Sequence, residues 1–147
     1  MVCEYGKEQE SRTCGDQWLF GDSIIVSPLS YPKKEREVWL PHGEWYDFFT
    51  GEKFAGGGKH TRKTDGIPVY VKAGTLLPVA EPVSHVERDT CFAITLYAYG
   101  DCKDAVCRLV EDDGETHSTA YRLLEYTLEN MEQDSFRYKI VGEKHIV

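Results

Sequence analysis

The sequence lacks both a long hydrophobic run and a cluster of basic residues, and these absences exclude two classes of protein. No stretch approaches the ~18 consecutive apolar residues that a membrane-spanning helix needs. Lysine and arginine together number 17 against 25 aspartates and glutamates, so the net charge is −8. Nucleic-acid binders need clustered basic side chains that displace counterions from phosphates. The sequence therefore predicts neither a membrane protein nor a nucleic-acid binder.

The cysteines also lack a recognisable pattern. They form an odd set of five with no Cys-x-x-Cys spacing: Cys3, Cys14, Cys91, Cys102 and Cys107. Secreted disulfide scaffolds use an even and regularly spaced set, and the chain does not open with a charged segment followed by an apolar one, as a signal peptide would. We therefore expect reduced thiols in a cytoplasmic protein.

Short segments rich in β-branched and aromatic residues recur along the chain between glycine and proline turns. This pattern is typical of β-strands, and it predicts strands at residues 23–27, 35–41, 44–50, 67–72, 92–99, 105–110, 121–128 and 136–141. The segment 121–128 also fits a helix, because its leucines recur at helical as well as strand spacing. Many short strands separated by turns favour a sandwich. We predict an all-β fold with a proximal antiparallel β-sandwich followed by a smaller, sandwich-like distal β unit.

A polar, proline-containing segment at residues 81–89 divides the chain at its weakest point. We therefore predict a proximal sandwich over residues 21–88 and a distal β domain over residues 89–147, and its short length leaves open whether the distal sandwich is complete. Residues 1–20 contain a polar stretch with no apolar period. We expect them to be the end of a preceding domain and a linker, in a chain cut from something larger.

The densest carboxylate cluster runs from Glu111 through Asp112 and Asp113 to Glu115. Two carboxylates that flank a bond can act as acid, base or nucleophile. Neighbouring residues on a strand point to opposite faces, so Asp112 and Asp113 cannot easily flank one substrate. We favour a hairpin turn at Asp113 and Gly114.

Two further patterns suggest sites but fail on spacing. The segment Gly56–Thr61 looks like a phosphate-binding loop, yet His60 stands where that loop needs Ser or Thr, and no helix pattern follows. Cys102, Cys107 and His117 are soft ligand types, but their spacing matches no zinc pattern. We predict a glycine turn in the first case and structural thiols with a surface histidine in the second.

The serines complete the search for a nucleophile. Ser23, Ser27 and Ser30 all lack the flanking glycines of a nucleophile elbow. We therefore predict no catalytic residue, no cofactor-binding residue, no metal ligand and no cofactor in this chain.

Aromatic side chains are the remaining candidates for ligand contact. The set comprises Trp18, Trp39, Trp45, Tyr46, Phe48 and Phe49. Exposed aromatic platforms on β-sandwiches stack against sugar rings, whereas buried aromatics fill a core or an interdomain interface. We favour core and interface roles and keep weak carbohydrate contact as an alternative.

Four segments in order along the chain resemble motifs of glycoside hydrolase family 31, which contains α-glucosidases and α-xylosidases. They are DQWLFGDSIIVSPL at 16–29, VWLPHGEWYDFFTG at 38–51, GIPVYVKAGTLLP at 66–78 and LVEDDGET at 109–116. The resemblance implies two C-terminal β-sandwiches that follow a (β/α)8 barrel, and retaining cleavage of α-glycosides by two aspartates of that barrel. Asp16 and Asp112 match family positions outside this catalytic pair.

The resemblance thus implies a non-catalytic C-terminal region that braces the barrel, with residues 1–20 as the end of the barrel and a linker. We expect the isolated chain not to hydrolyse α-glycosides. The expected partner is the catalytic barrel of the same parent chain, and the surface where it docks could instead form a dimer. The alternatives are a carbohydrate-binding module that holds α-glucan, and a free-standing β-sandwich interaction domain.

Overall fold

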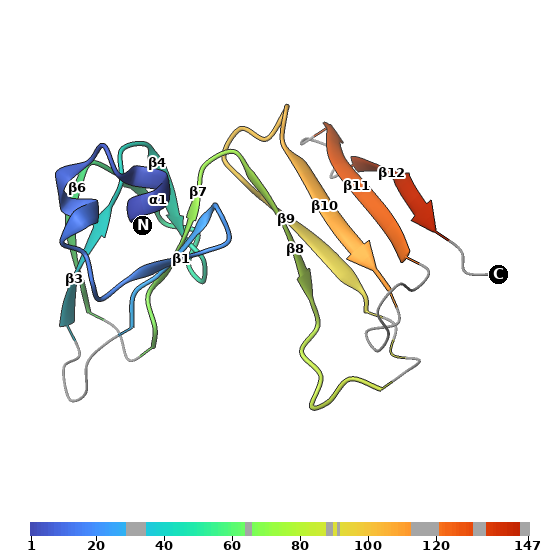
Figure 1. Cartoon of the computed structure of the whole chain (residues 1–147), viewed down its shortest axis with the longest axis horizontal. Coiled ribbons are helices and arrows are strands. Elements are labelled where there is room, and N and C mark those ends of the chain that lie inside the picture. The colour runs from blue at the N-terminus through green and yellow to red at the C-terminus, as the bar shows by residue number, and fades with distance from the viewer. Residues whose placement is uncertain are drawn as a thin grey trace. The chain divides into compact units, whose positions relative to one another are not determined.

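The computed structural model describes residues 1–28, 35–63, 66–87, 90, 92–112, 121–130 and 135–144, with the last strand described by its backbone. The chain folds into two units, Met1–Ala73 (unit 1) and Gly74–Val147 (unit 2). Strands dominate both units (Figure 1).

Unit 1 begins with a short helix, α1 (Val2–Tyr5), and one 3-10 turn, η1 (Gln9–Arg12). A five-stranded sheet follows, here called sheet A, in the order β1-β2-β7-β4-β5. Its strands are β1 (Trp18–Phe20), β2 (Ile24–Val26), β7 (Val69–Lys72), β4 (Glu44–Asp47) and β5 (Lys53–Ala55). Strands β3 (Glu35–Leu40) and β6 (Gly58–Lys63) form a second sheet, sheet B. All neighbouring strands pair antiparallel.

The core of unit 1 lies between these two sheets. Alternation along each strand sends one set of side chains inward. The buried cluster consists of Ile25, Trp45 and Tyr70 from sheet A with Val38 and Leu40 from sheet B, all fully buried. Met1, Tyr5 and Leu19 pack against this cluster from the N-terminal segment. Residues 1–20 are therefore an integral part of unit 1.

Unit 2 contains a two-stranded and a three-stranded antiparallel sheet. Strands β8 (Thr75–Ala80) and β9 (Ile94–Tyr99) form the first, and β10 (Val106–Glu111), β11 (Tyr121–Asn130) and β12 (Ser135–Lys144) form the second in that order. Its buried apolar side chains among the described residues are Leu76, Tyr99, Cys102, Cys107 and Leu124.

The all-β, sandwich-like prediction is confirmed, and the ambiguous segment 121–128 is part of strand β11. The division between units falls at Ala73 and Gly74, earlier than the boundary expected at residues 88 and 89. The reason is strand pairing: Thr75 pairs with Tyr99 and Ala80 with Ile94, so strands β8 and β9, on either side of the polar segment, belong to one unit. None of the described helices is long and apolar enough to span a membrane.

Candidate functional site

The predicted carboxylate cluster lies at the end of strand β10. Glu111 forms an ion pair with Arg122 of the neighbouring strand, with Oε2 and Nη2 2.9 Å apart. Asp112 is exposed, while Asp113, Gly114 and Glu115 lie outside the described residues. The part of the cluster that the structure describes thus forms a surface ion pair across two strands.

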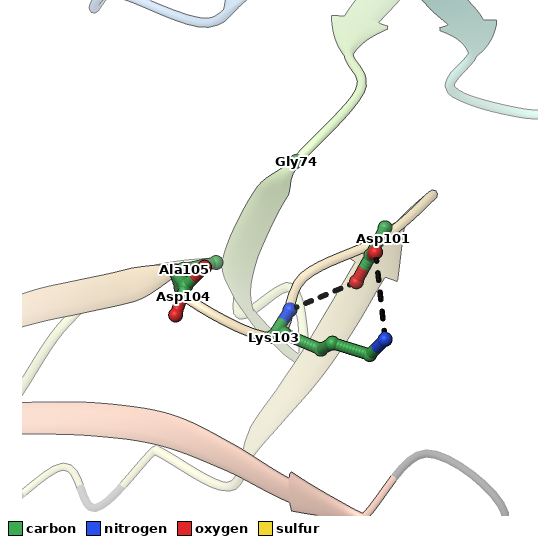
Figure 2. Close-up of a pocket in the computed structure, with 5 residues that line it drawn as sticks. All are labelled: Gly74, Asp101, Lys103, Asp104 and Ala105. Atoms are coloured by element: carbon green, nitrogen blue, oxygen red, sulfur yellow. Dashed lines mark hydrogen bonds and ion pairs between the residues drawn. The ribbon is translucent and has the colours of Figure 1, made fainter.

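An open hollow of about 350 Å³ lies beside the turn that follows β9, lined by Gly74, Asp101, Lys103, Asp104 and Ala105. Figure 2 shows Lys103 beside Asp101: its backbone N–H donates to Oδ1 at 3.2 Å, and Nζ lies 3.9 Å from Oδ2. Both side chains are largely exposed. A retaining glycosidase instead needs a sugar pocket with two carboxylates about 5–5.5 Å apart, one of them with a raised pKa. This hollow offers sugars no aromatic surface.

The glycine segment at 56–58 forms a turn whose amides are already bonded. Gly56 N–H donates to the Gly43 carbonyl at 2.7 Å, and Gly57 N–H donates to the Leu40 carbonyl at 2.8 Å. Gly57 has φ +85°, and a Cβ at Gly56 would lie 1.8 Å from the Pro41 oxygen. These amides cannot cradle a phosphate, because they hold the segment that connects β3 to β4.

The thiols proposed as soft ligands are buried. Cys102 Sγ donates to the Thr75 carbonyl at 3.3 Å and lies 3.6 Å from the Tyr99 carbonyl oxygen. Burial raises the pKa of Cys102 and of Cys107, which favours the neutral thiol over the thiolate that metals and electrophiles need. His117 lies outside the described residues. In the described part of the chain, no group of three or more His, Cys, Asp or Glu is placed to hold a metal ion.

Two of the three candidate serines, Ser23 and Ser27, lie among the described residues. Ser23 Oγ donates to the carboxylate of its neighbour Asp22 at 3.0 Å. Ser27 is fully buried, and its Oγ has no hydrogen-bond partner among the described residues. Ser30 lies outside the described residues.

Asp47 connects the two sheets of unit 1. Its Oδ1 accepts hydrogen bonds from the N–H groups of Phe49 (3.0 Å) and Thr50 (2.9 Å), and its Oδ2 lies 2.7 Å from Arg62 Nη2 on strand β6. Arg62 also donates to Glu52 at 2.9 Å. The carboxylate is only 6% exposed, and its charge is balanced by Arg62 within unit 1. Asp47 thereby fixes both the 47–51 turn and the position of β6.

Gln17 binds the free edge of strand β3. Its side-chain amide donates to the Trp39 carbonyl at 2.6 Å and accepts from the Trp39 N–H at 3.0 Å. It therefore forms the two bonds that a neighbouring strand would form. Beside it, Arg36 pairs with the Asp16 carboxylate at 2.8 Å and donates to the Pro28 carbonyl.

The Pro41–Gly43 turn anchors the N-terminal segment. Trp45 Nε1 donates to the Pro41 carbonyl at 2.8 Å, and the Trp45 ring lies 6.4 Å from the Tyr5 ring. Glu8 accepts from His42 through the backbone N–H at 3.2 Å and contacts Nδ1 at 2.8 Å. Pro41 and Trp45, in the family-like segment 38–51, therefore link strand β4 to the N-terminal segment and to the turn after β3.

The aromatic candidates divide into two groups. Trp39 and Trp45 are buried, and Tyr46 and Phe48 are half-buried, as a core or interface role requires. Trp18 and Phe49 are exposed by 50% and 71%. Phe20, absent from the predicted candidates, is 69% exposed. Its spacing two residues after Trp18 is the signal in the sequence, because residues i and i+2 share a strand face.

A family model described as "Glycosyl hydrolase family 31 C-terminal domain" matches residues 1–77. This chain belongs to glycosyl hydrolase family 31. An α-xylosidase of Saccharolobus solfataricus is 35% identical over 121 residues, covering 80% of this chain and 16% of its own length. Alpha-glucosidase 2 of Bacillus thermoamyloliquefaciens is 29% identical over 122 residues, covering 80% of this chain and 15% of its own length.

Solved structures of family 31 share the fold. The Xanthomonas citri α-xylosidase matches 99% of this chain with a TM-score of 0.80 at 23% identity, over 16% of its own chain. A Flavobacterium johnsoniae dextranase complexed with glucose also matches 99% of this chain, with a TM-score of 0.76 at 21% identity, over 20% of its own chain. The family 31 chain described here thus spans about a sixth of the curated relatives it matches. The motifs at Gln17, Trp45 and Asp47 lie within the part that the family model matches.

Proposed function

We propose that this chain is the non-catalytic C-terminal region of a retaining α-glycosidase and that it braces the (β/α)8 catalytic barrel of the same enzyme. The observation that carries the proposal is that polar side chains of the family motifs bond within unit 1. The polar groups of Gln17, Trp45 and Asp47 form hydrogen bonds to other residues of unit 1. Their role is to hold a rigid body rather than to meet a substrate.

The chemistry of glycoside cleavage supports this assignment. Retaining hydrolysis needs a carboxylate nucleophile and a carboxylic acid on either side of the scissile bond. The buried carboxylate of Asp47 is paired with Arg62, and Asp101, at the open hollow, is largely exposed. The proposal assigns the catalytic pair to the barrel, where loops at the strand ends form active sites.

The relatives suggest the class of substrate. They include an α-xylosidase, an α-glucosidase and a dextranase, so we assign the parent enzyme to O-glycosyl bonds of α-linked sugars, in carbohydrate metabolism. Unit 1 would be the proximal sandwich and unit 2 the distal β domain. The cysteine pattern favours the cytoplasm as the compartment.

A chimera tests the bracing role. This chain replaces the stretch of the Saccharolobus solfataricus α-xylosidase that aligns with it, and a second protein carries the deletion alone. The chimera is expected to hydrolyse p-nitrophenyl α-D-xyloside, while the deletion protein loses activity or unfolds at lower temperature. An inactive chimera, or a deletion protein as active and stable as the intact α-xylosidase, contradicts the bracing role.

Exposed aromatics favour a second candidate, a carbohydrate-binding module. Trp18, Phe20 and Phe49 present apolar rings to solvent, and such rings can stack on sugars. Isothermal titration with maltooligosaccharides separates the two functions. The bracing role predicts no heat at millimolar sugar, whereas saturable heat that a Trp18→Ala substitution removes would favour sugar binding.

A further inference from the structure

Three neighbouring strands of sheet A are apolar on both faces. Strand β1 reads Trp-Leu-Phe, β2 reads Ile-Ile-Val, and β7 begins Val-Tyr-Val. A sheet with one face in water alternates apolar and polar residues, whereas strands covered on both faces read as continuous apolar runs. The inner face of these strands, with Leu19, Ile25 and Tyr70, is covered by the core of unit 1. The pattern indicates that the outer face is also covered in the working protein.

The strand register gives the composition of that outer face. Trp18 pairs with Val26, which pairs with Val69, and Phe20 pairs with Ile24, which pairs with Val71. These six residues form two apolar rows across β1, β2 and β7, without a charged or hydrogen-bonding group except the Trp18 indole N–H. Val71 is already buried, while Trp18 and Phe20 are 50% and 69% exposed. The accessible part of the patch therefore lies over β1, the edge strand of sheet A.

The charged part of the outer face of sheet B, at Glu35, Glu37, Lys59 and Lys63, shows what a solvated surface of the same unit looks like. Glu35 pairs with Lys63 and Glu37 with Lys59, each with its nitrogen and oxygen 3.3 Å apart. All four side chains are more than half exposed. This charged part of the outer face of sheet B is thus built for water, whereas the outer face of β1 and β2 carries the large aromatic side chains that are enriched at protein interfaces.

We propose that the outer face of β1 and β2, centred on Trp18 and Phe20, is the surface against which the remainder of a family 31 enzyme chain packs. This inference rests on the proposed function, which it deepens by naming the docking face. The relatives carry more than four-fifths of their length outside the match with this chain, and that remainder is the part of the enzyme that would cover the patch.

The chemistry of the patch specifies what the occupant presents. A charge buried without a partner costs several kcal/mol, so the facing surface of the enzyme is aliphatic or aromatic and carries no charge at its centre. A saccharide fits less well, because its hydroxyl groups would meet only the indole N–H of Trp18 within the six-residue patch. Loss of their water contacts without replacement disfavours such binding.

The test uses the chimera described above with two double substitutions. W18S/F20S makes the outer face of sheet A polar, and E37S/K59S alters the outer face of sheet B as a matched control. W18S/F20S is expected to lower the unfolding temperature of the chimera by about 5 °C or more and to speed its heat inactivation about ten-fold. The E37S/K59S chimera is expected to behave as the unsubstituted one.

The same substitutions in the isolated 147-residue chain check folding. There, W18S/F20S is expected to change the unfolding temperature by less than about 2 °C, because half or more of each side chain is already in water. Three results would overturn the inference: equal effects of the two double substitutions in the chimera, destabilisation of the isolated chain as large as that of the chimera, or maltooligosaccharide binding that W18S/F20S removes. If the unsubstituted chimera is inactive, the bracing role itself fails, and the docking face fails with it.

Discussion

The two units are built from the same kind of strand but bury their side chains to different degrees. In unit 1, Ile25, Trp45 and Tyr70 are fully buried along with Val38 and Leu40. In the described part of unit 2, the large apolar core residues Leu76, Tyr99 and Leu124 keep 5–7% exposure. Unit 1 is thus closed around its largest side chains, while the described core side chains of unit 2 stay slightly exposed.

Buried polar groups sharpen the contrast. Unit 1 buries Gln17 and Asp47, each with specific bonds between separate segments. In the described part of unit 2 the corresponding residue is Glu125, whose partner Arg108 is 65% exposed. The family model matches residues 1–77, nearly the extent of unit 1. The family model thus matches the unit whose buried Gln17 and Asp47 bond to specific partners.

The largest expected effect is on the core of unit 1. Trp45→Ala removes a fully buried ring and its hydrogen bond to Pro41, and is expected to lower the free energy of unfolding by about 3–5 kcal/mol. Leu124→Ala in unit 2 is expected to cost about 2 kcal/mol. Urea titrations measure both, with tryptophan fluorescence reporting on unit 1, which holds all three tryptophans, and far-UV circular dichroism on both units. A larger loss in the free energy of unfolding for Leu124→Ala than for Trp45→Ala would show that the core of unit 1 is not the more tightly packed one.

The second effect separates a buried ion pair from a more exposed one. Arg62→Ala leaves the buried Asp47 carboxylate without its cation and is expected to cost about 3 kcal/mol. Arg108→Ala, whose side chain is mostly in water, is expected to cost about 1 kcal/mol or less. Thermal unfolding of the two variants gives the difference. Equal costs would show that the polar bonds of unit 1 are no more important than those of unit 2.

A smaller effect tests backbone packing within unit 1. Gly56→Ala would place its Cβ 1.8 Å from the Pro41 carbonyl oxygen, so the backbone must shift, at a cost of about 1–3 kcal/mol. At Gly58 nothing lies within 4 Å of an added Cβ, so Gly58→Ala is the matched control and is expected to change stability by less than about 1 kcal/mol. If both variants unfold alike, the turn is not tightly packed against the Pro41–Gly43 segment.

The smallest effect at neutral pH comes from the buried Tyr70 hydroxyl, which has no hydrogen-bond partner among the described residues. Burial raises the pKa of Tyr70 to about 12, with Arg62 opposing the shift. Since the folded-state pKa exceeds the ordinary value of 10.0, folding favours the neutral phenol, and that stability is lost as pH rises from about 10 to 12.

Tyr70→Phe is therefore expected to change stability at pH 7 by less than about 1 kcal/mol and to flatten the alkaline decline. Tyr97→Phe, on a half-exposed side chain of unit 2, serves as the control. Urea midpoints between pH 8 and 12 measure the difference. An unchanged alkaline decline in Tyr70→Phe would contradict a buried, neutral Tyr70 hydroxyl.

The sequence predicts strands only where apolar residues alternate or form a run. Strands without such a pattern, such as β6 and β1, are therefore not predicted. Strand β6 reads Gly-Lys-His-Thr-Arg-Lys, and its inward Arg62 is balanced by Asp47, a partner fifteen residues away that no local pattern reveals. Strand β1 has three residues, too few for a period. The polar segment 81–89 is composed like a linker, and only the pairing of β8 with β9 shows that the strands on either side of it belong to one unit.

The candidate site also divides into what local sequence shows and what only the fold shows. The four motifs were enough to indicate the family, because each motif is a continuous stretch of sequence. The roles of Gln17 and Asp47 depend on partners at Trp39 and Arg62, so only the folded structure shows that they are used internally. Exposure of Trp18 and burial of Trp45 could not be distinguished from composition, since both residues stand in apolar segments.

The proposed bracing role predicts that this family 31 chain supports catalysis without performing it. The most direct test incubates the purified 147-residue chain with p-nitrophenyl α-D-glucoside and α-D-xyloside and follows p-nitrophenol release. The account predicts release no faster than in buffer at any chain concentration. Release that rises in proportion to the concentration of the pure chain would contradict it.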